Sequence, residues 1–331
     1  MHIVRFVAPP TGGFPLPGVP AGSDGLRTRP DVAVGISDGV TITELTDVHG
    51  VSELLGLPAA ALRERCAAAG GPRHDAAAVR LLPPVDGHME VWAAGVTYRR
   101  SREARVVESE RAPDVYQQVY DAERPELFFK STAWRVTGDG ETVAIRADSG
   151  IDVPEPELGL VVNRHAEIVG YTVVNDMSSR TIEGENPLYL PQAKIYLGGC
   201  AVGPAIRPGW EVPDPYNLDI TMTIRRDGAQ AWTGSAGTGL LRRRLDELVA
   251  YLFRADDFPH GVVLATGTSI VPDLPFTLLP GDEIVITITD VGTMTSTVVA
   301  GKTAMSWLTN TVTEPPPPAP TEDPGVDNLR Q

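Results

Sequence analysis

The sequence predicts an α+β fold in which a β-rich main domain follows a smaller N-terminal α/β unit. Short apolar runs with strand-like alternation recur along most of the chain, separated by turn signals such as Asp-Gly and Pro-Gly-Asp. Segments with helical spacing are few by comparison. At 331 residues the chain is long enough for about two domains with ample buried cores.

Composition narrows the classes of partner and compartment. The formal net charge is −15, from 43 acidic and 28 basic residues. Nucleic acids and anionic membranes would repel such a chain, so neither is expected as a partner. Only two cysteines occur, Cys66 and Cys200, and the sequence has no signal-like or membrane-length apolar run. We therefore expect a soluble, cytoplasmic protein in a reducing compartment.

Residues 1–85 are expected to form the N-terminal unit. Gly and Pro dominate residues 9–30, which predicts a surface loop, and residues 81–84 predict a linker into the main domain. The regular elements expected here are a strand at His2–Val7, a hairpin of Val32–Ile36 and Val40–Ile42 around Asp38-Gly39, and a helix at Pro58–Ala69.

Residues 86–313 are expected to form the main domain, and the Pro-rich, acidic residues 314–331 a disordered tail. Helices are expected over residues 101–111 and 114–123, which are charged, and over 240–254, where leucines recur at helical spacing. The expected strands are Val91–Val96, Leu127–Phe129, Leu158–Val162, Ile168–Val174, Leu218–Arg225, Ala229–Trp232, Val262–Ala265, Ile284–Ile288 and Thr295–Val299.

Three carboxylates lie next to two of the predicted strands. Glu155 and Glu157 are two residues apart, so in a strand both would point to one side of the sheet, and Asp176 ends the next apolar run. Like charges held together and buried are costly unless a cation compensates them. An all-oxygen set suits Mg²⁺ or Mn²⁺ better than zinc. From the spacing alone, solvated edge charges remain the commoner meaning of Glu-x-Glu.

The surrounding motifs resemble the fumarylacetoacetate hydrolase superfamily, and within it the 2-keto-3-deoxy-pentonate dehydratase branch. The resemblance covers about residues 90–305 and implies a β-roll for the main domain. It is carried by the stretches Gly95–Tyr98, Ser101–Arg105, Pro125–Lys130, Asn175–Arg180 and Ile182–Lys194.

The resemblance also implies a set of site residues. Glu155, Glu157 and Asp176 would bind Mg²⁺, with Mn²⁺ or Ca²⁺ as alternatives, and Glu126 and Lys194 would be catalytic. For Glu126 the alternative is a strand-end charge, and for the arginines near 100 a solvated helix face. The residues expected to contact substrate are Thr97, Ser101, Arg102, Lys130 and Thr268.

The implied reaction is removal of water from a 2-keto-3-deoxy sugar acid, such as 2-dehydro-3-deoxy-D-arabinonate to 2,5-dioxopentanoate, through an enolate that the cation stabilises. Hydrolysis, decarboxylation or isomerisation of an acylpyruvate-like 2-keto acid is the alternative, as is a non-catalytic ligand-binding homologue. The hydrolase branch has a histidine where this chain has Ser101, which disfavours hydrolysis. The family resemblance further implies a homodimer or homotetramer.

Overall fold

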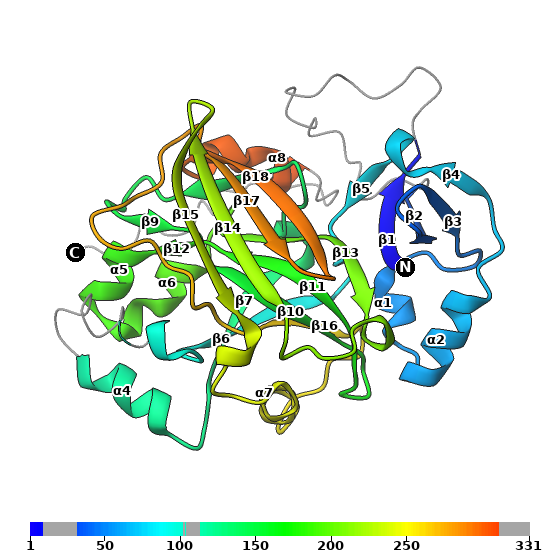
Figure 1. Cartoon of the computed structure of the whole chain (residues 1–331), viewed down its shortest axis with the longest axis horizontal. Coiled ribbons are helices and arrows are strands. Elements are labelled where there is room, and N and C mark those ends of the chain that lie inside the picture. Colours follow the sequence, from blue (N-terminus) through cyan, green and yellow to red (C-terminus); the bar gives the residue numbers. More distant parts are fainter. Residues whose placement is uncertain (9–31, 102, 104–112, 311–331) are drawn as a thin grey trace, which may run out of the picture.

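The computed structural model describes residues 1–8, 32–101, 103 and 113–310. Arg102, the predicted loop at 9–30, most of the predicted helix at 101–111 and the predicted tail lie outside these residues. Within them no helix is both long and apolar enough to cross a membrane. Among the described residues, β-strands outnumber helices (Figure 1), which confirms the β-rich fold class.

Strands supply most of the regular structure. The α-helices are α1 (Val51–Leu54), α2 (Ala59–Ala67), α4 (Pro113–Asp121), α5 (Arg180–Glu185), α6 (Leu190–Lys194), α7 (Leu245–Leu252) and α8 (Ser306–Asn310). The strands are β1 (His2–Val7), β2 (Val32–Ser37), β3 (Thr41–Glu44), β4 (Arg73–Asp75), β5 (Arg80–Leu82), β6 (Glu90–Gly95), β7 (Glu126–Thr132), β8 (Thr142–Ile145), β9 (Asp152–Val153), β10 (Pro156–Val162), β11 (Ile168–Asp176), β12 (Ser178–Ser179), β13 (Cys200–Pro208), β14 (Asp219–Arg226), β15 (Ala229–Gly237), β16 (Val262–Ala265), β17 (Glu283–Ile288) and β18 (Gly292–Ala300).

Two large sheets and one small one organise the described part of the chain. The largest has eleven strands in the order β4-β3-β2-β1-β13-β11-β10-β16-β6-β7, with β5 paired to β1. A five-stranded sheet has the order β15-β14-β17-β18-β8, and β9 and β12 form a two-stranded sheet. Figure 1 shows the five-stranded sheet lying across the middle of the large one, with the N-terminal strands at the right.

The facing surfaces of the two large sheets form one hydrophobic core. Strand β17 alternates buried and half-buried residues, as expected for a strand with one face on a core. Strand β10 is buried along its whole length, because its second face packs toward α1 and α2 in another core. Leu158 and Leu160 point into the first core, and Val161 points into the second.

Several predicted elements differ from those observed. Residues 81–84 were expected to be a linker, but Leu81 and Leu82 belong to β5 and pair with β1. Strand β15 runs on to Gly237, five residues beyond its predicted end at Trp232, and helix α7 starts only at Leu245. The predicted turn at Asp227-Gly228 is confirmed, with positive φ angles of 52° and 77° that suit a tight hairpin.

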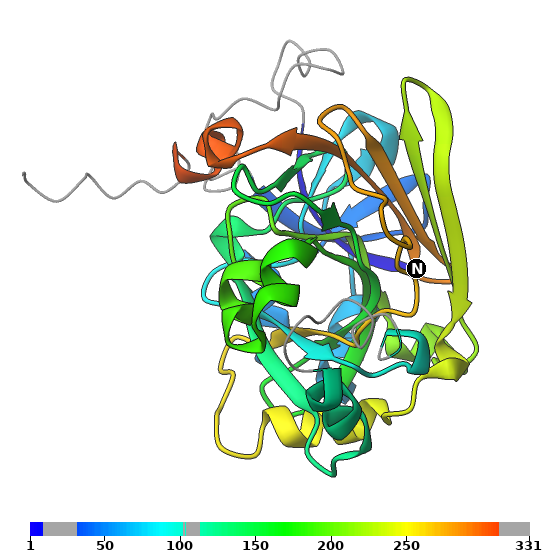
Figure 2. The same ribbon diagram turned by 90° about the vertical axis from the view of Figure 1, so that its left-hand side faces the viewer.

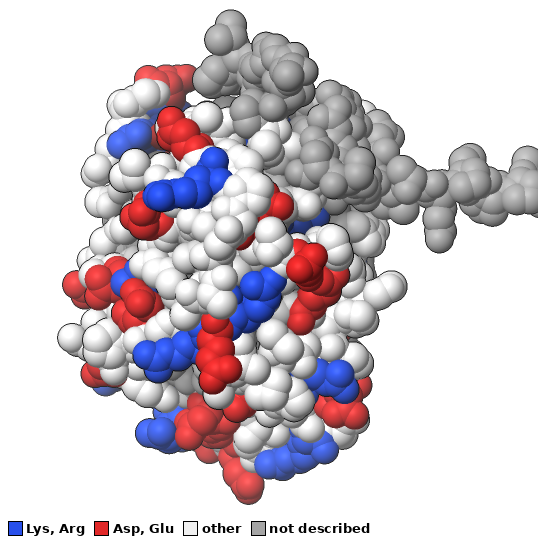
Figure 3. Space-filling view, turned by 90° about the vertical axis from the view of Figure 1, so that its right-hand side faces the viewer, with Lys and Arg blue, Asp and Glu red and all other residues white. Residues whose placement is uncertain are grey.

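The N-terminal strands are continuous with the main sheet. Strand β1 pairs with β13, and Ile3 and Leu54 lie in the same core cluster as Val161 and Val263. The division of the chain at residue 85 therefore stays a prediction. On the face that the N-terminal unit presents in Figure 3, acidic and basic side chains are interspersed.

Candidate active site

The site is built where β10 begins beside the end of β11. These strands pair antiparallel, and the amide of Asp176 donates to the carbonyl of Glu155 at 2.9 Å. Alternation then fixes the direction of the side chains. Glu155 and Glu157 share the face of Val161, and Asp176 shares the face of Val174, and both valines lie in the core beside α1 and α2. All three carboxylates therefore converge on one face of the sheet.

The convergence meets the requirements of a cation site. One oxygen from each of Glu155, Glu157 and Asp176 lies within 4.8 Å of the others, and the residues are only 3%, 2% and 1% exposed. Burial raises the pKa of Glu157 well above its usual value, and the charges of Asp176 and Glu155 raise it further. The amide of Gly267 donates to Glu157 at 2.7 Å. This crowding of buried oxygen ligands fits a hard divalent ion.

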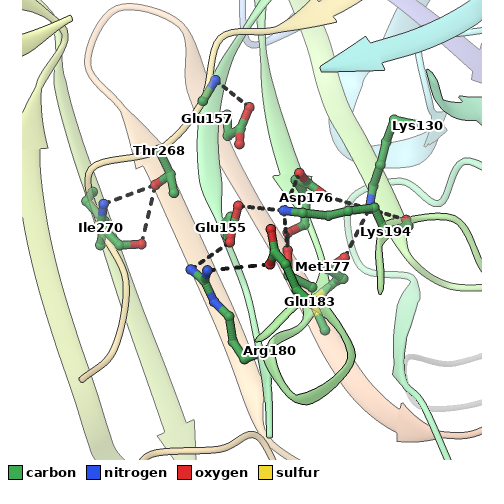
Figure 4. A network of polar contacts seen from close by, with 12 residues as sticks. Lys130, Glu155, Glu157, Asp176, Met177, Arg180, Glu183, Lys194, Thr268 and Ile270 are labelled. Atoms are coloured by element: carbon green, nitrogen blue, oxygen red, sulfur yellow. Dashed lines mark hydrogen bonds and ion pairs between the residues drawn. The ribbon is translucent and has the colours of Figure 1, made fainter. Parts of the chain in front are cut away.

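Three buried cations surround the other two carboxylates, as Figure 4 shows. Lys194 Nζ donates to Glu155 Oε2 at 2.8 Å and to Asp176 Oδ2 at 2.9 Å. Lys130 forms an ion pair with Asp176 Oδ1, and Arg180 forms one with Glu155 Oε1 at 2.8 Å. Burial alone would raise the pKa of Asp176, but Lys130 and Lys194 outweigh it and hold that pKa below its usual value.

A small cavity opens beside this network. Its walls carry both residues predicted to be catalytic, Glu126 from the start of β7 and Lys194 from the end of α6. Figure 2 turns the side of α5 and α6 toward the viewer. The lining residues are Ala94, Gly95, Val96, Ser101, Glu126, Phe128, Glu155, Glu157, Asp176, Glu183, Leu190, Lys194, Gly267 and Thr268.

A larger hollow has a different set of lining residues. It has a volume of about 530 Å³, against about 20 Å³ for the cavity beside the carboxylates, and β15 and residues 269–273 form much of its wall. None of the three carboxylates lines it. Chemistry rather than size therefore identifies the candidate site.

The predicted substrate-contacting residues divide into two groups. Ser101 and Thr268 line the cavity, and their hydroxyls also bond Tyr98 and Ile270. Thr97 is 1% exposed and its hydroxyl donates to the carbonyl of Thr266 at 2.6 Å. Lys130 donates to the carbonyls of Met177 and Lys194. Neither Thr97 nor Lys130 is on the cavity wall, and Arg102 lies outside the described residues.

Four residues in or beside the network were not selected from the sequence, namely Ser178, Ser179, Arg180 and Glu183. Ser178 accepts from Lys194 Nζ at 2.6 Å, and Arg180 forms an ion pair with Glu183 at 3.5 Å. Ser179 caps helix α5 by accepting from the amide of Ile182, which starts the helix directly beyond Asp176. The three-residue spacing of Arg180 and Glu183 was the available signal, because it places both side chains on one face of a helix.

Comparison with known proteins gives consistent relatives. Residues 90–299 match the family model described as fumarylacetoacetate hydrolase C-terminal. A probable 2-keto-3-deoxyxylonate dehydratase of Haloferax volcanii is 52% identical over 215 residues, 65% of this chain and 73% of the relative. The 2-dehydro-3-deoxy-D-arabinonate dehydratase of Saccharolobus solfataricus is 44% identical over 223 residues, 66% of this chain and 74% of the relative.

A solved structure matches the whole fold. It is a 2-keto-3-deoxy-D-arabinonate dehydratase complexed with magnesium and 2,5-dioxopentanoate, and it aligns with a TM-score of 0.74 at 34% identity. The alignment covers 91% of this chain and 99% of that one. The N-terminal strands of this chain are therefore part of the shared architecture.

Proposed function

Because the chain belongs to the fumarylacetoacetate hydrolase family, we propose that it is a divalent-metal-dependent dehydratase of 2-keto-3-deoxy sugar acids. Conversion of 2-dehydro-3-deoxy-D-arabinonate to 2,5-dioxopentanoate and water is the reaction that its relatives favour. The observation that carries the proposal is the joint placement of Glu126, Lys194 and three buried carboxylates around one cavity.

Glu155, Glu157 and Asp176 would hold Mg²⁺, for which Mn²⁺ or Ca²⁺ could substitute. Bound there, the ion supplies Lewis-acid polarisation of the 2-keto acid, a contribution of several kcal/mol to stabilising negative charge in reactions of this kind. Two cations that do not line the cavity hold the ligand carboxylates in place: Lys130 contacts Asp176, and Arg180 contacts Glu155.

Dehydration requires two proton movements. A base removes a proton from C3, the C4–oxygen bond breaks, and an acid protonates the departing hydroxyl, which gives water and 5-hydroxy-2-oxopent-3-enoate. Isomerisation of this enone, in which C3 and C4 each gain a proton while C5 and its hydroxyl each lose one, then gives the dioxo acid. Glu126 and Lys194 face the same cavity, and we assign these two roles to this pair. Ser101 and Thr268, on the same wall, are assigned to orienting the substrate.

Thr97 and Lys130 act one step further from the substrate in this proposal. The Thr97 hydroxyl fixes the carbonyl of Thr266, next to the Gly267 amide that bonds Glu157. Lys130 fixes Asp176 and the carbonyl of Lys194. Arg102 stays a predicted substrate-contacting residue.

A panel assay tests the reaction. The protein is incubated with Mg²⁺ and a set of 2-keto acids that includes 2-keto-3-deoxy-pentonates, acylpyruvates and oxaloacetate, and the products are weighed by mass spectrometry. Loss of one water from a 2-keto-3-deoxy-pentonate, abolished by a chelator, is expected. Loss of carbon dioxide, cleavage of a carbon–carbon bond or an unchanged panel would replace the dehydratase with a decarboxylase, a hydrolase or a binding protein, respectively.

We further propose a cytoplasmic homodimer or homotetramer. The family likeness favours self-association, and both cysteines are buried and unpaired, which suits a reducing compartment. Light scattering coupled to size-exclusion chromatography measures the assembly, and a monomer at micromolar concentration would contradict this part of the proposal.

A further inference from the structure

Every oxygen of two of the three carboxylates already faces a cation. On Glu155, Oε1 meets Arg180 and Oε2 meets Lys194. On Asp176, Oδ1 meets Lys130 and Oδ2 meets Lys194. An added metal ion would compete with these side-chain cations for the same oxygens, most directly with a cation that lies between both carboxylates.

Lys194 is the cation that can withdraw. It is the one of the three cations that lines the cavity, and it alone bonds both Glu155 and Asp176. Lys130 donates to two backbone carbonyls, and Arg180 also forms an ion pair with Glu183. These additional contacts fix both side chains in place. Lys194 has a further partner, Ser178, which can keep one of its hydrogen bonds after the carboxylates are released.

The use of lysine in the chain sets this position apart. Of the 28 basic residues only three are lysines, at positions 130, 194 and 302, and two of these are in the buried network. An ammonium is a compact point charge, whereas a guanidinium grips carboxylates through a planar fork. A lysine ammonium can therefore occupy the position of a small metal ion between two carboxylates, and a metal ion can displace it more easily than it could displace a guanidinium.

We propose that Lys194 is an internal counter-ion that exchanges with the divalent metal. Without metal, its ammonium neutralises Glu155 and Asp176. Metal binding expels it from between them and leaves it on the cavity wall, beside the substrate. This inference rests on the proposed function and gives the divalent metal a second role in it. Metal binding frees the amine of the catalytic Lys194.

The first test measures Mg²⁺ binding by calorimetry, without substrate. Lys194→Met removes the competing charge, and we expect it to tighten binding by about tenfold or more, because unit charges a few Å apart interact by several kcal/mol even at an effective dielectric of 20. Lys302→Met, the same change at an exposed lysine, is the matched control and should leave the affinity unchanged. Unchanged or weaker binding by Lys194→Met would overturn the exchange.

The second test needs no variant, so it does not depend on how Lys194→Met folds. Native protein is briefly treated with formaldehyde and a borane reductant, and methylation of each lysine is measured by mass spectrometry with and without Mg²⁺. Lys302 should react in both states and Lys130 in neither. Lys194 should be protected without Mg²⁺, when Glu155 and Asp176 hold its ammonium, and become at least about tenfold more reactive with it, since those hydrogen bonds are then broken. Equal protection of Lys194 in both states would contradict the proposal.

The tests separate this inference from the proposed function. If wild-type protein and every variant fail to bind Mg²⁺, both are overturned. If wild-type protein binds Mg²⁺ but Lys194→Met and the labelling show no effect, the metal site stands and the exchange is wrong.

Discussion

At the scale of single residues, Glu126 is the side chain on which turnover should depend most. Its carboxylate lies so close to Gly95 that a Cβ there would stand 2.1 Å from Oε2, so the absence of a side chain at Gly95 makes room for it. We expect Glu126→Gln to lower kcat by roughly 10²–10⁴-fold, the usual contribution of general acid–base catalysis. Its Mg²⁺ affinity should stay close to wild type, because Glu126 is not one of the three clustered ligands. Equal turnover in the variant would remove Glu126 from the mechanism.

Asp152 predicts a pH dependence of stability. Burial raises its pKa above the ordinary 3.8, although Ser149 and the amide of Arg146 lower it in part. Between 3.8 and the raised value the folded protein keeps a proton that the unfolded chain has lost, so stability falls as pH rises through this window. Asp152→Asn should reduce that fall. Urea unfolding of metal-free protein from acidic to neutral pH measures it, and identical profiles for wild type and variant would refute the assignment.

Some residues could be predicted from the sequence and others could not. The spacing of Glu155 and Glu157 fixes their common direction in any strand, and the structure brings both to Asp176. The cationic partners of these carboxylates could not be predicted in this way. Lys130 and Lys194 reach Asp176 only through the tertiary fold, which no local sequence pattern specifies.

At the scale of elements, the loop after β16 should control the metal site. Gly267 has φ +87°, and a Cβ there would lie 2.1 Å from Thr97 Oγ1 and 2.9 Å from the carbonyl of Ala94. Gly267→Ala must therefore shift the amide that bonds Glu157. We expect Mg²⁺ affinity to fall about 10–100-fold, as is usual when support of a metal ligand is lost.

Gly140 provides the control for that substitution. It also has a positive φ, +73°, but a Cβ there would meet nothing within 4 Å. Gly140→Ala should cost roughly 1–2 kcal/mol of stability through backbone strain and leave Mg²⁺ binding unchanged. Equal effects of the two variants on Mg²⁺ affinity would show that strain, rather than the Gly267 amide, matters.

Predictability of the elements follows how local their signals are. The hairpin of β14 and β15 was predicted because Asp227-Gly228 specifies a tight turn between alternating runs. The end of β15 was missed because Gly234 and Gly237 have low strand propensity, yet pairing with Met222 and Asp219 of β14 keeps them extended. The strand at residues 80–82 was missed because its partner, β1, is more than seventy residues away.

At the scale of the whole molecule, the N-terminal strands and the main domain should unfold together. They share the eleven-stranded sheet and one core cluster, so neither can lose its packing alone. All five tryptophans lie between positions 92 and 307, but Trp210 stacks with Arg63 of the N-terminal unit. Fluorescence of a Trp210→Phe variant therefore reports mainly the main domain, whereas far-ultraviolet circular dichroism reports both parts. We expect the two urea transitions to coincide. A transition seen by circular dichroism alone would indicate an independent N-terminal domain.

Long-range pairing also limits what the sequence predicts at this scale. The motifs identified the family, and with it the β-rich architecture, correctly. Strands β1 and β13 pair at Ile3 and Ile206. Neither apolar run contains a signal that specifies the other as its pairing partner.

The most direct measurement titrates metal-free protein with Mn²⁺ and follows the free ion by electron paramagnetic resonance. The account predicts one tightly bound ion per chain, displaced by excess Mg²⁺ and lost or strongly weakened in Glu157→Gln, whose carboxylate is one of the three that converge. Absence of binding by the wild type, or undiminished binding by the variant, would contradict it.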